Sequence, residues 1–133
     1  MARYVIDART LLHVIAHGVA VSPTHQLVAP NMIRSQALAL LMEAVRADEM
    51  SDAEALVQHE RLTELKMRLL GDRVSRRTAW KIAREHGWAT TVDAEYLAVC
   101  KLQADALVTV DETLAAQASG IVPLAPLEAL SEA

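Results

Sequence analysis

Near the carboxyl end of the chain lies the run Ala106-Leu107-Val108-Thr109-Val110-Asp111-Glu112. Its apolar and β-branched residues are continuous rather than alternating, which is typical of a strand buried on both faces of a parallel sheet. A shorter run of the same kind, Tyr4-Val5-Ile6-Asp7, lies near the amino terminus. Both runs stop at an aspartate. Because functional sites of open parallel sheets lie beyond the carboxyl ends of the strands, these two aspartates are the first candidate site residues.

The segments around these runs predict strands that alternate with helices. Further short strands are predicted at 27–30, which Pro30 ends, and at 120–124. Helices are predicted at 10–17, at 31–46, from the capping box at Ser51 to about Leu70, from a cap at Ser75 to His86-Gly87, at 94–103 and at 112–118. This order predicts a single α/β domain over residues 1–133, in which helices flank a short central parallel sheet of four to five strands.

Composition narrows the class of protein. Apolar residues make up 53% and charged residues 23% of the 133 residues, which argues against disorder. The single cysteine, Cys100, excludes an internal disulfide and a four-cysteine zinc site, and we expect it to be buried. No apolar run approaches the ~18 residues of a transmembrane helix, and an acid interrupts the first apolar run too early for a signal peptide. We therefore expect a cytoplasmic protein with no membrane partner.

The net charge of −4 hides an uneven distribution of charge. Eight of the 13 Lys and Arg residues lie between Arg61 and Arg84, so that this segment is +6 and the rest of the chain is −10. A local basic surface on an acidic protein can still bind phosphates, although a pair of solvated helices is the alternative. The candidate contacts to nucleic-acid phosphates are Arg76, Arg77, Lys81 and Arg84, the last three on one helical face. Trp80 lies in the same helix, but we expect it in the core because large side chains are scarce in this chain.

A third aspartate, Asp93, lies at the predicted start of a helix. Carboxylates that crowd together repel one another, and they are tolerated when a divalent cation neutralises them. Mg²⁺ or Mn²⁺ held in this way can activate water and hold a phosphodiester. Two of the acids also have a structural alternative, since Asp93 could cap a helix that begins at Ala94, and Asp111 could cap the helix at 112–118. Asp7 interrupts an apolar strand and is harder to explain as a cap.

Three motifs together resemble the acidic motifs of PIN domains. They are Val5-Ile6-Asp7, Val92-Asp93-Ala94-Glu95-Tyr96-Leu97-Ala98 and Leu107-Val108-Thr109-Val110-Asp111-Glu112-Thr113-Leu114. The similarity covers essentially the whole chain and is greatest to the VapC-like toxins of type II toxin–antitoxin systems. The resemblance implies a PIN-like three-layer fold and a metal-dependent endoribonuclease in which Asp7, Asp93 and Asp111 bind Mg²⁺ or Mn²⁺. It also implies a homodimer, a small antitoxin protein as partner, and tRNA or rRNA as substrate.

Two positions depart from the pattern of that family. A glutamate is usual six residues after the proline of the second strand, where this chain has Gln36, which can offer a carbonyl but no charge. A small hydroxyl residue is common two positions after the first aspartate, where this chain has Arg9. Arg9 can pair with Asp7 or Asp111, compete with the metal, or grip the scissile phosphate as an RNA contact. Both changes predict weaker metal affinity and lower activity.

The catalytic candidates are therefore the three aspartates with Gln36 and Thr109, a threonine that resembles one placed in the family just before the last acid. Its hydroxyl could orient a metal-bound water. The main alternative to an enzyme is a PIN-like module with impaired catalysis, which binds RNA or a partner protein without turnover. Gln36 and Arg9 favour this alternative, and the retained aspartates favour the enzyme. A receiver domain and a haloacid-dehalogenase-type phosphatase fit poorly, because Asp7-Ala8-Arg9-Thr10 lacks the second acid that each needs.

Overall fold

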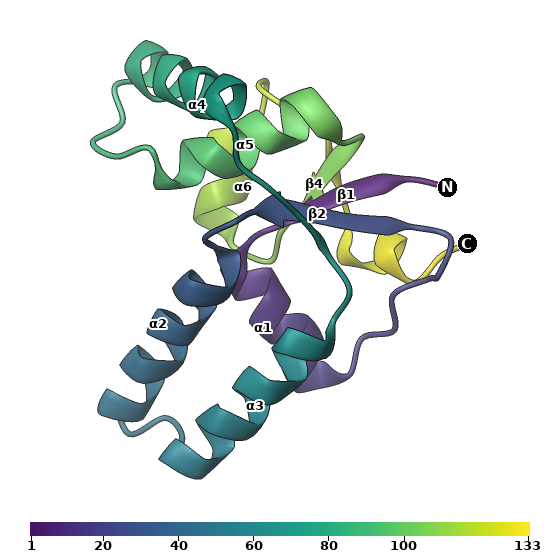
Figure 1. Cartoon of the computed structure of the whole chain (residues 1–133), viewed down its shortest axis with the longest axis vertical. Helices are drawn as coiled ribbons and strands as arrows, with labels where there is room; N and C mark the ends of the chain where they lie inside the picture. Colours follow the sequence, from purple (N-terminus) through teal and green to yellow (C-terminus); the bar gives the residue numbers. More distant parts are fainter.

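The chain folds around one parallel sheet in a computed structural model that describes residues 1–133 (Figure 1). The strands are β1 (Arg3–Ile6), β2 (Gln26–Pro30), β3 (Arg68–Leu70), β4 (Ala106–Val108) and β5 (Leu124–Ala125). They lie in the order β3-β2-β1-β4-β5, and every neighbouring pair is parallel. The predicted α/β fold with a short parallel sheet flanked by helices is confirmed.

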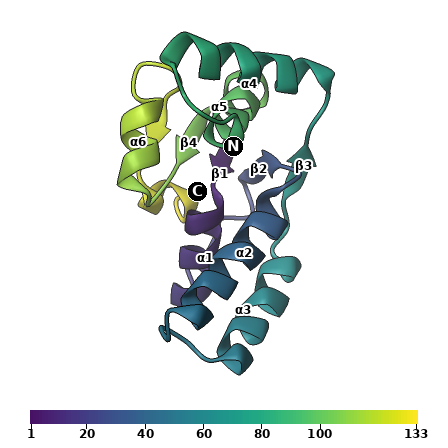
Figure 2. The same ribbon diagram turned by 90° about the vertical axis from the view of Figure 1, so that its left-hand side faces the viewer.

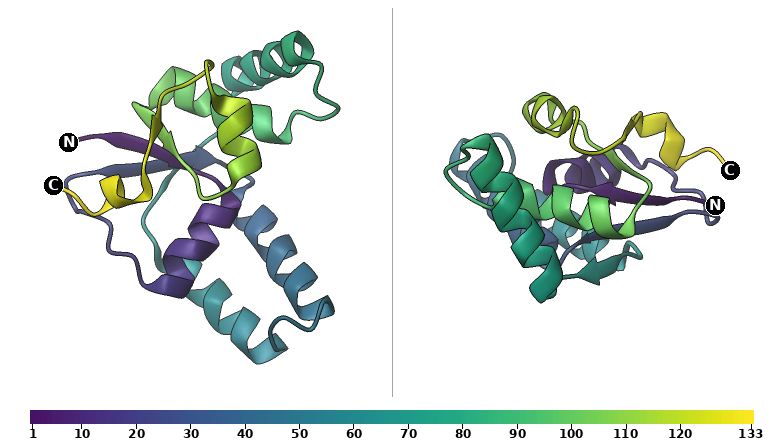
Figure 3. Two further views of the ribbon diagram at one scale, coloured as in Figure 1. Left: turned by 180° about the vertical axis from the view of Figure 1, so that it is seen from behind. Right: turned by 90° about the horizontal axis from the view of Figure 1, so that it is seen from above.

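Six α-helices flank the sheet. They are α1 (Ala8–His17), α2 (Ile33–Arg46), α3 (Asp52–Glu64), α4 (Arg73–His86), α5 (Val92–Gln103) and α6 (Glu112–Ala118), followed by a 3-10 turn, η1 (Leu127–Leu130). Figures 1 and 3 show α4 and α5 on one side of the sheet and the arm formed by α1, α2 and α3 on the other. None of these helices is long and apolar enough to span a bilayer.

The core lies between the central strands and α5. Val5 and Ile6 of β1 and Leu107 of β4 are fully buried, as the continuous apolar runs predict. Tyr96 on α5 is the largest fully buried side chain, and Cys100 on the same helix is also buried, as expected. Helix α5 therefore packs across the sheet and carries its polar first turn toward the carboxyl ends of the strands.

The prediction of one helix from Ser51 to about Leu70 is wrong. Helix α3 begins after Ser51, whose hydroxyl accepts from the Glu54 N–H, but it ends at Glu64, and Arg68–Leu70 form the edge strand β3. Leu, Met, Lys and Arg all have good helix propensity, so the local sequence favours a helix there. Pairing of β3 with β2, Val28 opposite Arg68 and Pro30 opposite Leu70, overrides that preference.

Three other predicted boundaries differ from the structure. The last strand is Leu124–Ala125 rather than 120–124, because a turn at Gly120, with φ +83°, separates α6 from it. Helix α4 is capped by Asp72 and not by Ser75; the two side chains form a reciprocal capping box, and Gly87 ends the helix as predicted. The strand predicted over 106–110 ends at Val108, which leaves Thr109 and Val110 in the loop that precedes Asp111.

Candidate functional site

The parallel sheet brings two of the predicted aspartates to one edge. Asp7 follows β1 and Asp111 follows β4 after a two-residue loop, and these strands are neighbours with Ile6 opposite Val108. Asp93 lies in the first turn of α5, which packs on β1 and β2. Figure 2 looks onto the carboxyl ends of the strands, with α4 across one side and the α1–α3 arm on the other. The three aspartates therefore come from three separate segments to one side of the sheet.

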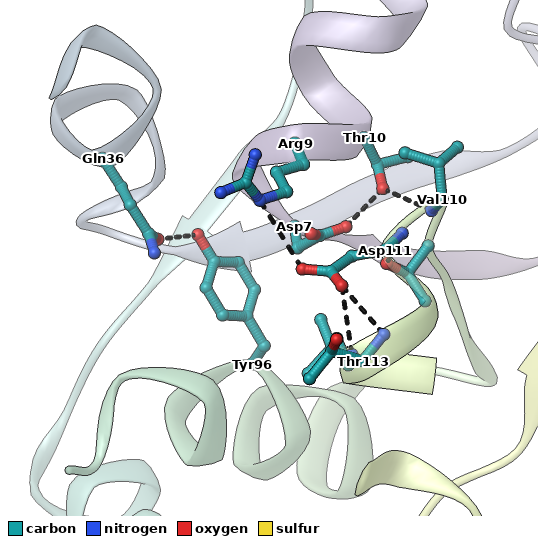
Figure 4. Close-up of polar contacts among 10 residues, drawn as sticks. Asp7, Arg9, Thr10, Gln36, Tyr96, Val110, Asp111 and Thr113 are labelled. Atoms are coloured by element: carbon teal, nitrogen blue, oxygen red, sulfur yellow. Dashed lines mark hydrogen bonds and ion pairs between the residues drawn. The ribbon is translucent and has the colours of Figure 1, made fainter. Parts of the chain in front are cut away.

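Asp7 is buried, with 5% of its surface exposed, and one threonine holds it in place. The Thr10 hydroxyl donates to Oδ1 of Asp7 and accepts from the backbone N–H of Val110 at 3.0 Å (Figure 4). Burial raises the pKa of Asp7; hydrogen bonds from Thr10 and Thr109 oppose this rise, and the charge of Asp111 adds to it. Thr10 is a site residue that the sequence reasoning missed, although its place three residues after an aspartate at a helix start is a usable signal.

Asp111 has a structural role as well as a place in the site. Its Oδ1 accepts from the N–H groups of Thr113 at 3.0 Å and Leu114 at 3.3 Å, so the alternative that it caps a helix is confirmed. The Thr109 hydroxyl accepts from the Asp111 N–H at 3.0 Å. Oδ2 of Asp111 lies 3.6 Å from Nε of Arg9. Of the two partners predicted for Arg9, the structure thus selects Asp111.

Asp93 is partly exposed and caps nothing. Helix α5 begins at Val92 rather than Ala94, with Thr91 at the capping position, so the capping alternative for Asp93 is wrong. Burial raises the pKa of Asp93, and the charges of Asp111 and Asp7 raise it further. This carboxylate therefore lies within electrostatic reach of the other two.

Gln36 reaches the site from α2 and meets α5 there. The Tyr96 hydroxyl donates to Oε1 of Gln36 at 2.6 Å (Figure 4). Burial, together with the charge of Asp7, raises the pKa of the Tyr96 hydroxyl, which keeps it a donor. One lone pair of the Gln36 carbonyl is thus occupied. Tyr96 is a second site residue that the sequence analysis does not single out, although it lies within the second of the three acidic motifs.

The carboxylates interact through charge but do not form a closed ligand set. No three His, Cys, Asp or Glu side chains lie close enough to hold a metal ion. His13 and His17 have adjacent rings, with centroids 4.2 Å apart, and no third ligand beside them. Arg9 also lines a cavity of about 610 Å³ together with Leu41, Glu43 and Val110. The site thus combines three carboxylates, one amide and one guanidinium next to an open cavity.

The predicted RNA contacts lie on α4. Arg76, Arg77, Lys81 and Arg84 are all exposed, and none of them forms an ion pair, since the Arg9–Asp111 pair is the one salt bridge of the structure. Helix α4 begins three residues after the end of β3, which places its amino terminus at the strand edge where Asp7 and Asp111 lie. The expectation that Trp80 belongs to the core is wrong, because 64% of its surface is exposed.

Comparison with known proteins bears on the fold. No family model matches the chain, and no curated protein matches it. Among solved structures, it is similar to the crystal structure of PAE2754 from Pyrobaculum aerophilum, with a TM-score of 0.74 and 23% sequence identity. The match covers 97% of this chain and 93% of that one. A likeness at this identity supports the α/β architecture over the full length of the chain and carries no statement about activity.

Proposed function

We propose that this protein is a metal-dependent endoribonuclease of the PIN-domain, VapC-like type. One observation carries the proposal: Asp7, Asp93 and Asp111 come from three segments to one edge of the sheet, where burial raises the pKa of Asp7 and of Asp93 and charge repulsion among the aspartates adds to the rise. Repulsion of this kind costs stability unless a cation offsets it. Perturbed carboxylates at the carboxyl edge of a parallel sheet are typical of a catalytic site.

The donor chemistry fits Mg²⁺ or Mn²⁺, which prefer carboxylate oxygens. No three of these side chains are close enough to form a ligand set as the structure stands, so Asp7, Asp93 and Asp111 would have to turn toward one another to hold the ion. The bound ion would supply an activated water and a counter-charge for the phosphate. The protein's own groups do the rest. Thr10 and Thr109 fix the site around Asp7 and Asp111, and Arg9 offers a planar donor set for a phosphate oxygen.

A second candidate is a PIN-like module that binds RNA or a partner protein without turnover. Two observations favour it. Arg9 partly neutralises Asp111, and the Gln36 carbonyl accepts from Tyr96, so that both departures from the family pattern reduce the capacity to bind a cation. The remaining parts of the proposal are common to both candidates: a homodimer, a small antitoxin protein as partner, and action in the cytoplasm.

The test is cleavage of a panel of tRNA and rRNA fragments in Mn²⁺ and in Mg²⁺, with Mn²⁺ binding measured by calorimetry on the same samples. The variants are Asp93→Asn, Gln36→Glu and a matched control, Asp52→Asn, which changes an exposed aspartate in the first turn of α3. The enzyme proposal expects the native protein and the control to cut and Asp93→Asn to lose cleavage. Cleavage by Gln36→Glu alone supports the binding module. Absence of both cleavage and Mn²⁺ binding in all four proteins contradicts the proposal.

A further inference from the structure

The most exposed large aromatic side chain of the molecule is surrounded by basic residues. Trp80 has 64% of its surface exposed, in a chain with only two tryptophans, two tyrosines and no phenylalanine. Tryptophan is normally well covered in folded proteins because its exposure leaves a large apolar area in water. The buried face of α4 is formed instead by Ala79, Ile82 and Ala83. The packing of the helix therefore does not require Trp80.

Helical spacing places Trp80 in the middle of the cationic face of α4. Arg76, Arg77 and Arg84 are four residues before, three residues before and four residues after it, the spacings at which side chains on a helix are neighbours. Arg73 lies two turns before it on the same face. All four arginines are exposed and none forms an ion pair. Glu85 is the single acid within α4, so the helix is strongly cationic on a protein whose net charge is −4.

The helix that carries this face packs along α5. Helix α5 supplies Asp93 and Tyr96, and Figure 2 shows α4 lying across one side of the molecule in the view onto the carboxyl ends of the strands. A chain bound along α4 would therefore lie on the helix that packs against the one carrying Asp93.

We propose that this face of α4 binds single-stranded RNA, with Trp80 stacked on a base and the flanking arginines on the backbone phosphates. The inference deepens the proposed function and rests on it for the identity of the nucleic acid. A flat aromatic ring between unpaired guanidinium groups suits a strand whose bases are unstacked and accessible. Duplex RNA hides its base faces and would use only the arginines. An acidic protein segment would use the charges but would have no comparable need of the ring.

The test is direct binding with divalent cations chelated, so that no cleavage occurs. In a Trp88→Phe background Trp80 is the only tryptophan, and its fluorescence reports contact with a short oligouridylate of about ten nucleotides. We expect quenching on binding, about tenfold weaker affinity in Trp80→Ala, and near-native affinity in Trp80→Phe. Duplex RNA of equal length is expected to bind both native and Trp80→Ala protein alike. Arg77→Gln is expected to reduce the slope of log affinity against log salt concentration by about one, because one phosphate contact is lost.

The matched control is Leu56→Ala, which removes another exposed apolar side chain, 62% exposed on α3, and is expected to leave affinity unchanged. Native affinity in Trp80→Ala overturns the inference, as does equal quenching by polyglutamate, which would assign the face to an acidic protein. If the protein cleaves RNA but the fluorescence of Trp80 is not quenched on binding, this inference is refuted and the enzyme proposal stands. If binding quenches Trp80 and depends on it but no RNA is cleaved, the enzyme proposal is refuted and this inference stands.

Discussion

Replacing Thr10 by valine tests the bridge between the two strand ends that carry aspartates. The Thr10 side chain is fully buried, and valine has nearly the same shape. The change removes a hydrogen bond to the Asp7 carboxylate, and hydrogen bonds to charged groups contribute about 1.5–3 kcal/mol to stability. It also leaves the Val110 N–H without its acceptor, which costs about 1–3 kcal/mol. The added methyl group returns about 1 kcal/mol. We therefore expect the free energy of unfolding to fall by about 3 kcal/mol.

For a chain of this length that loss corresponds to a fall in Tm of roughly 10 °C, measurable by circular dichroism and by urea titration. Thr10→Ser is the matched control, because it keeps the hydroxyl and loses a methyl group, and it is expected to cost about 1 kcal/mol. The penalty of the valine variant is expected to be smaller in acid, where Asp7 is protonated and a neutral acceptor makes a weaker hydrogen bond. A Tm within about 2 °C of the native value would refute the bridging role.

Three further predictions concern charge at the site and in the core. Burial and the like charges of neighbouring aspartates raise the pKa of Asp93 in the folded protein above the ordinary value of about 4. The folded state therefore favours the protonated form, and the contribution of Asp93 to stability is lost as the pH rises from about 4 through the folded pKa. Asp93→Asn is thus expected to raise the Tm of the metal-free protein at pH 7 by about 2 °C, a value that allows for solvent screening of the charges. The variant is expected to show no gain in Tm in acid, and a Tm below the native value at pH 7 would contradict this prediction. Arg9→Gln releases Asp111 from its ion pair and is expected to tighten Mn²⁺ binding about fivefold in calorimetry, whereas unchanged affinity would show that Arg9 does not compete with the metal. Burial raises the pKa of the Cys100 thiol to about 12, so iodoacetamide at pH 8 is expected to modify Cys100 about 100-fold more slowly in the folded protein than in the urea-unfolded protein. Mass spectrometry measures the two rates, and equal rates would show that the thiol is accessible.

Much of the architecture could be predicted from local patterns. The buried strands around Val5 and Leu107 are continuous apolar runs, and such runs have few other stable arrangements in a chain of this size. The capping box at Ser51 and the glycine at 87 mark helix ends through backbone geometry that neighbouring residues determine. These signals are local, so the sequence reports them directly.

The errors occur where pairing partners are distant in the chain. Residues 68–70 have the composition of a helix and become strand β3 only because β2, some forty residues earlier, offers free backbone groups at the sheet edge. Large apolar residues usually lie in the core, which is the basis of the prediction for Trp80, but α4 buries Ala79, Ile82 and Ala83 and leaves the Trp80 ring outside. Propensity cannot report which face of a helix a neighbour will cover.

The candidate site divides in the same way. The sequence by itself determined that Asp7, Asp93 and Asp111 stand at segment ends, since each interrupts or adjoins an apolar run. Only the tertiary structure decided that Thr10 joins Asp7 to the Val110 backbone, that Tyr96 holds the Gln36 carbonyl, and that Arg9 pairs with Asp111 rather than Asp7. Hydrogen bonds between residues 60 or 100 positions apart depend on strand order and helix packing, which no local pattern encodes.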